Sequence, residues 1–81
     1  MEEQIKLIWD FRGPNAKPTA EHHQLHLMDY LKMTNQSEMQ TGVEEQNDAH
    51  VVAYMIVEKS QMKKFRDALK PHRGQLVTGT T

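Results

Sequence analysis

The sequence predicts an α+β domain in which the elements follow the order strand, helix, strand, strand, helix, strand. Three observations lead to this fold class. Alternating apolar residues mark the strands, apolar residues at helical spacing mark two amphipathic helices, and glycine, proline and asparagine separate these segments. The chain has 81 residues, so we expect one domain over residues 1–81.

The first strand is predicted over Gln4–Phe11, where apolar side chains occupy the odd positions and face inward. The first helix is predicted to open at Pro18-Thr19, with Thr19 as its N-cap, and to end near Met33 or Thr34. Three apolar residues on one face of this helix are expected to pack on the sheet, namely Ala20, Leu27 and Leu31.

The middle of the chain predicts a hairpin. Alternation around Met39–Glu44 indicates a half-exposed edge strand, and the run 46–48 (Gln-Asn-Asp) is typical of a turn. The segment His50–Val57 is rich in β-branched residues and apolar on both faces. Such a strand is expected to be buried on both sides, which places it in the centre of the sheet.

The last part of the chain predicts a second helix and a short strand. Ser60 is the expected helix cap, and Pro71 ends the helix. The final strand is predicted over Gln75–Thr78. The apolar stripe of the helix consists of Met62, Phe65 and Leu69.

This order of elements resembles the ferredoxin-like fold, a βαββαβ sandwich whose four-stranded antiparallel sheet carries both helices on one face. The resemblance covers nearly the whole chain. The sequence also resembles small bacterial domains of this architecture, and none of its motifs points to a family of known activity. The fold hosts many unrelated functions, so the functional argument depends on individual residues.

Composition narrows the function classes. The formal net charge is −1, so we expect no general affinity for nucleic acid or for anionic membranes. There is no cysteine, which excludes disulfides and thiolate metal sites and fits a cytoplasmic protein. The first four residues carry two acids, so no secretory peptide is expected there.

Histidine is the most informative residue type, because three of the five histidines lie in the run 21–26. His22 and His26 are four residues apart and share a helix face, which Asp29 continues. Together with His23 they are the candidate ligands of a divalent metal ion such as zinc, nickel or copper. The plain alternative is a solvated helix face, with His23 as a flanking residue that makes a local contact.

A second group of candidates lies on the sheet. Asp10 and His50 occupy outward positions at the same end of adjacent strands, and Arg12 lies close by. Asp10, Arg12 and His50 are therefore the candidate contacts of a small anionic ligand. A structural ion pair between Asp10 and His50 is the simpler interpretation.

Four apolar side chains are expected on the outward face of the sheet, namely Ile8, Val52, Tyr54 and Ile56. An exposed apolar patch of this kind marks an interaction surface. We therefore predict a homodimer formed through this face.

Three functions remain open. The first is a small cytoplasmic binding or regulatory module with a metal or small-anion site at the histidine-rich end. The second is an enzyme of the dimeric α+β-barrel type, with His50 or His23 as general base and Asp10 orienting it. The third is a pure protein-interaction domain. The binding module is favoured, with no residue assigned to catalysis, because the sequence contains no nucleophile motif and no cofactor loop.

Overall fold

The computed structural model describes residues 3–36 and 39–77 of the chain. The elements, in chain order, are β1 (Gln4–Arg12), α1 (Ala16–Met33), β2 (Gln40–Asn47), β3 (His50–Glu58), a 3-10 turn (Lys59–Gln61), α2 (Met62–Leu69) and β4 (Arg73–Val77). No helix in these described ranges is long and apolar enough to cross a membrane.

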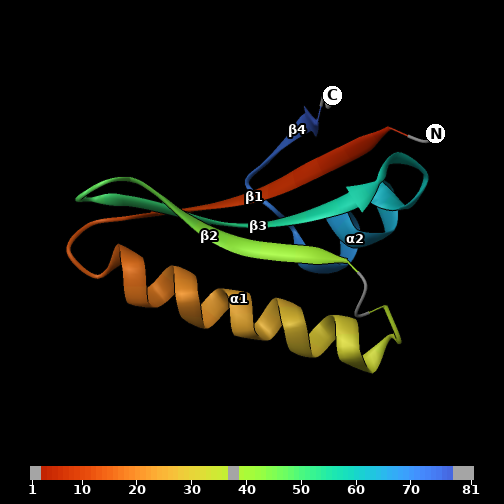
Figure 1. The fold of residues 1–81 in the computed structure, drawn as a ribbon, viewed down its shortest axis with the longest axis horizontal. Coiled ribbons are helices and arrows are strands. Elements are labelled where there is room, and N and C mark those ends of the chain that lie inside the picture. The colour runs from red at the N-terminus through yellow and green to blue at the C-terminus, as the bar shows by residue number, and fades with distance from the viewer. Residues whose placement is uncertain (1–2, 37–38, 78–81) are drawn as a thin grey trace.

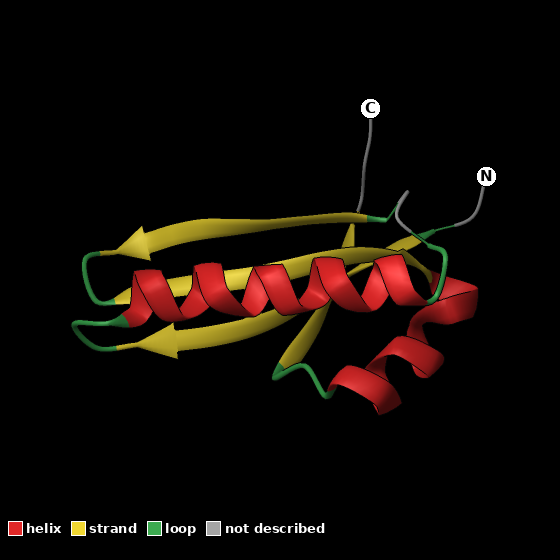
Figure 2. Ribbon diagram, turned by 90° about the horizontal axis from the view of Figure 1, so that it is seen from below, coloured by secondary structure: helices red, strands yellow, loops and turns green. Residues whose placement is uncertain are grey.

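The strands form one antiparallel sheet in the order β2-β3-β1-β4. Both helices lie on the same side of this sheet (Figures 1 and 2). This arrangement confirms the predicted ferredoxin-like α+β fold. The two central strands, β1 and β3, pair over their full lengths from Gln4 opposite Glu58 to Arg12 opposite His50.

The core lies between the sheet and the helices. Odd-numbered residues of β1 and β3 point into it, as the alternation in β1 predicts for that strand, and α1 covers them with four buried residues. Phe65 is the fully buried anchor of α2. The buried cluster comprises Leu7, Trp9, Ala16, Ala20, Leu27, Leu31, Val51, Ala53, Met55, Val57 and Phe65.

The predicted helix starts are wrong. Asn15, not Thr19, is the N-cap of α1, so the helix begins at Ala16 and gains one buried residue for its inner face. Pro18 is tolerated because the first helical turn needs no backbone donor at that position. At the second helix, Ser60 lies in the 3-10 turn, and the N-cap of α2 is Gln61.

The hairpin and the last strand also differ in extent from their predictions. β2 continues to Asn47, past the predicted strand end, because the strand stays paired with β3 through a bulge between Glu45 and Asn47. The turn is then made at residues 48–49, where the Asn47 Oδ1 atom accepts the Ala49 N–H at 2.9 Å. β4 begins at Arg73, two residues early, and the predicted last residue Thr78 lies outside the described residues.

Candidate functional site

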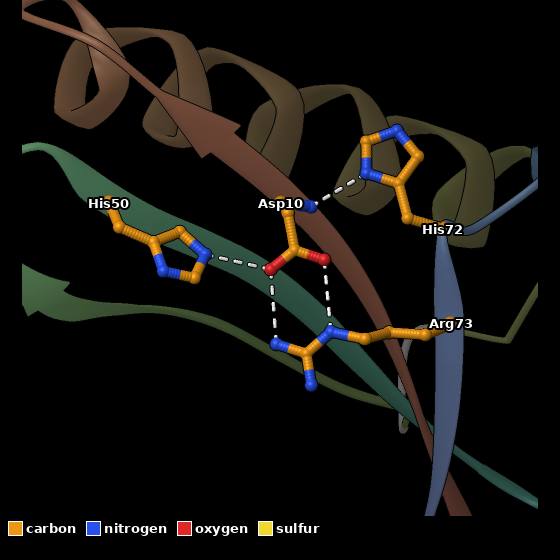
Figure 3. A network of polar contacts seen from close by, with 4 residues as sticks. All are labelled: Asp10, His50, His72 and Arg73. Atoms are coloured by element: carbon orange, nitrogen blue, oxygen red, sulfur yellow. Dashed lines mark hydrogen bonds and ion pairs between the residues drawn. The ribbon is translucent and has the colours of Figure 1, made fainter.

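A carboxylate-centred network lies on the outward face of the sheet (Figure 3). The Asp10 Oδ1 atom is 2.8 Å from His50 Nε2 and 3.0 Å from Arg73 Nη2. Arg73 Nε donates to Asp10 Oδ2 at 2.9 Å, which makes the arginine contact bidentate. Three strands thus supply one polar cluster, because β1 carries Asp10, β3 carries His50 and β4 carries Arg73.

The strand register explains how these side chains meet. Asp10 lies opposite Val52, whereas His50 lies opposite Arg12, so Asp10 and His50 are diagonal neighbours on adjacent strands. Arg73 is paired with Ile8 on the other side of β1, which is again one diagonal step from Asp10. Arg12 itself is exposed at the end of β1.

The network controls the charge of Asp10. The bidentate hydrogen bond from Arg73 holds the pKa of Asp10 well below its usual range, against the opposing effect of burial and with further help from His50. Because Asp10 stays ionised and accepts hydrogen bonds only, the Nε2 atom of His50 carries the proton in this contact. The neutral form of His50 then leaves Nδ1 as an acceptor.

Sequence reasoning missed the role of Arg73. The signal was present, because an arginine directly after His72 can reach the sheet once the last strand begins at that position. The last strand is predicted to begin two residues later, at Gln75, which leaves Arg73 at the end of the second helix and outside the sheet. Arg73 shares the sheet face of Asp10 because it pairs with Ile8, which points to that face. This alignment is visible only in the pairing of β4 with β1.

His72 extends the pairing of β4 with β1. Its backbone N–H donates to the Ile8 carbonyl at 2.9 Å, and its ring Nδ1 accepts the backbone N–H of Asp10 at 2.8 Å. The imidazole nitrogen therefore takes the place of a strand carbonyl. This role requires Nδ1 without a proton.

His22 and His26 form a pair on the exposed side of α1. Their Nε2 atoms are 3.0 Å apart, and their ring centroids are 4.6 Å apart. Both side chains are exposed. Their spacing of four residues on a regular helix brings the two rings together.

His23 does not join this pair. Its ring contacts Trp9 and Phe11 of β1, with centroid separations of 4.9 Å and 5.5 Å, and its Nε2 atom is buried with no hydrogen-bond partner. Burial lowers the pKa of His23, and the neighbouring His26 adds to this effect. The described residues contain no group of three His, Asp or Glu side chains that could hold one metal ion together.

The outward apolar residues are covered by side chains of the same chain. Ile8 and Val52 are buried, while Tyr54 and Ile56 are half-buried. The ammonium group of Lys6 lies 4.4 Å from the centre of the Tyr54 ring. The bare apolar patch expected on this face is therefore much reduced, because only Tyr54 and Ile56 keep partial exposure.

Large exposed apolar residues of the described chain lie elsewhere. Three are on α1, where Leu25, Met28 and Met33 have 56%, 48% and 80% of their surface exposed. A hollow of about 360 Å³ beside α1 is bordered by Leu25, Met28 and Met39. A second hollow of about 390 Å³ lies between α2 and β4, where the exposed Leu76 forms part of the wall.

The fold and these contacts define a ferredoxin-like α+β domain with a carboxylate network on its open sheet face and an imidazole pair on its long helix. Comparison of the chain with protein-family models, with curated proteins and with solved structures found no match.

Proposed function

We propose that this protein is a small binding module that takes up a divalent transition-metal ion through His22 and His26. The observation that carries the proposal is the separation of 3.0 Å between their Nε2 atoms. Two imidazole nitrogens at this distance on one exposed helix face form a bidentate donor set. The helix is held rigidly, because its opposite face is buried in the core.

The separation can be compared with metal coordination geometry. A zinc–imidazole bond is about 2.0–2.1 Å long, so two ligands of a tetrahedral ion are about 3.4 Å apart. The observed pair needs to open by only a few tenths of an ångström to fit this value. Such a change lies within the freedom of an exposed side chain that rotates about its own bonds.

The donor type selects the metal class. Imidazole nitrogen suits zinc, nickel and copper, whereas calcium and magnesium prefer oxygen ligands. Asp29, three residues after His26, lies on the same exposed helix face, but it does not form a three-residue ligand group with the pair. His23 is left out of the donor set, since its Nε2 atom is buried.

The test is a calorimetric titration of the untagged protein with zinc and with nickel, alongside His26→Gln and His22→Gln. We expect saturable binding that either substitution weakens by about tenfold or more, which corresponds to about 1.4 kcal/mol. His50→Gln is the matched control, because it removes an imidazole from the sheet and leaves α1 intact. Binding that survives in the His22/His26 double variant, or no binding at all, would contradict the proposal.

A second candidate function is acid–base chemistry by His50. The contact that favours it is the 2.8 Å hydrogen bond to Asp10, which orients the imidazole as in many catalytic pairs. This function requires a neutral His50 that is protonated on Nε2 at neutral pH. Nitrogen chemical shifts of the His50 ring check this tautomer, and an imidazole protonated on Nδ1 would exclude it.

A further inference from the structure

From the same imidazole pair, and resting on the proposed metal binding, we infer that a second copy of this chain completes the site. Helix α1 packs against its symmetry mate around a two-fold axis, and one metal ion on the axis is held by His22 and His26 of both copies. The result is a metal-bridged homodimer with four imidazole ligands.

The donor set of a single chain is incomplete. Structural zinc sites have four protein ligands, and one helix face supplies two. Within residues 3–36 and 39–77, no third His, Asp or Glu is placed to complete a set with this pair. A two-fold axis doubles the pair without further design, since each copy presents the same two nitrogens.

The shape of the helix suits such an arrangement. α1 spans 18 residues, so it is about 27 Å long and offers five turns to its copy. In an antiparallel pair of α1 helices, the two-fold axis passes between His22 and His26. His22 of each copy then faces His26 of the other copy. Two pairs related in this way can surround an ion tetrahedrally.

Leu25 supplies the apolar contact beside the ion. It lies between the two histidines in sequence, on the solvent side of α1, and 56% of its surface is exposed. Close to the axis, this side chain meets its own copy and is removed from water. Asp29 lies on the same exposed helix face, so each copy also brings a negative charge to this interface.

The competing interface is the outward face of the sheet. Ile8 and Val52 on that face are already buried within one chain. Dimerisation through the sheet face would therefore remove little of their apolar surface from water. The α1 interface is also small, because it involves one side of one helix, and small interfaces are weak. The dimer is therefore expected to depend on the metal and to separate when the metal is removed.

The experiment measures mass in solution by light scattering, with zinc or with a chelator, for the untagged protein and two variants. Leu25→Asp places a charge in the α1 interface while both histidines remain. Ile56→Asp is the matched control, because it places the same charge on the sheet face. Metal content per chain is measured on the same samples.

We expect a dimer with one zinc ion per two chains in the wild type and in Ile56→Asp, and monomers in chelator. Leu25→Asp is expected to remain a monomer with zinc at the same protein concentration. A monomer that binds one zinc ion per chain overturns the dimer and leaves the proposed function standing. A dimer that persists in chelator and is lost in Ile56→Asp also overturns it, whereas no zinc binding at all overturns both.

Discussion

The strongest prediction concerns Asp10, which we replace by asparagine. The side chain of Asp10 is only 16% exposed and accepts three hydrogen bonds, two from Arg73 and one from His50. In Asp10→Asn the amide oxygen can replace Oδ1, but the amide NH₂ then faces the donor Arg73 Nε. One hydrogen bond is lost, and the other two no longer involve a charged acceptor.

The magnitude follows from these contacts. Hydrogen bonds to charged groups contribute about 1.5–3 kcal/mol, and neutral ones contribute about 0.5–1.5 kcal/mol. Arg73 is 51% exposed, so solvent screens part of its contribution. We expect a loss of about 2 kcal/mol in the free energy of unfolding, which lowers the melting temperature by about 8–16 °C in a domain of this size.

The loss should depend on pH in a defined direction. Folding lowers the pKa of Asp10, so its contribution to stability is fully present above the pKa of the unfolded chain and decreases as the pH falls. The difference between wild type and Asp10→Asn is therefore constant above about pH 5 and shrinks as the pH falls below about 4. Urea unfolding at several pH values measures this difference.

The matched control is Glu44→Gln, the same chemical change on the same face of the sheet. Glu44 pairs with Lys6 at 2.9 Å, but its side chain is 48% exposed. An exposed pair contributes little, so we expect a loss below about 0.5 kcal/mol. If both variants lose equally little, or if the Asp10→Asn difference does not change in acid, then the network does not stabilise the fold as argued.

Three further predictions concern single contacts. Gly42→Ala should cost about 1 kcal/mol, because a Cβ at this position overlaps the outer end of the half-buried Tyr54 ring, which must shift; no loss in urea unfolding would contradict this packing contact. Phe65→Ala should cost about 3–5 kcal/mol by the same assay, since Phe65 is fully buried, whereas Phe65→Leu keeps most of the volume and should cost clearly less. His72→Ala should speed hydrogen exchange of the Asp10 amide, because this N–H loses its acceptor. In His72→Asn the side-chain Oδ1 can accept the same hydrogen bond, so the amide should remain protected. Equal exchange rates in both variants would refute the role of the His72 ring.

Much of the fold was predictable from local patterns. Alternation along β1 indicated a strand with one inward face, and the β-branched run of β3, apolar on both faces, indicated a central strand. The apolar stripes of α1 and α2 indicated which helix faces are buried. Their order along the chain then restricted the topology to very few arrangements. Helix starts were less predictable, because Asn15 and Gln61 act as N-caps without a side-chain hydrogen bond and so leave little local signal.

The candidate site was predictable only in part. The spacing of His22 and His26 followed from helix geometry, and alternation placed Asp10 and His50 on one face of the sheet. Helical spacing placed His23 at the edge of the apolar face, but its contacts with Trp9 and Phe11 depend on how closely α1 approaches the sheet. Helical spacing places a residue on one face of the helix, but it does not specify which side chains of the sheet that face contacts.

The local pattern of residues was sufficient for the elements, their order and the faces they bury, because these depend on periodicities of two and 3.6 residues. Contacts across the sheet needed the register of three strands. Arg73 reaches Asp10 since β4 starts at Arg73 and pairs it with Ile8, and this alignment depends on tertiary packing. The same packing covers Ile8 and Val52, whose apolar character alone suggested an open interface.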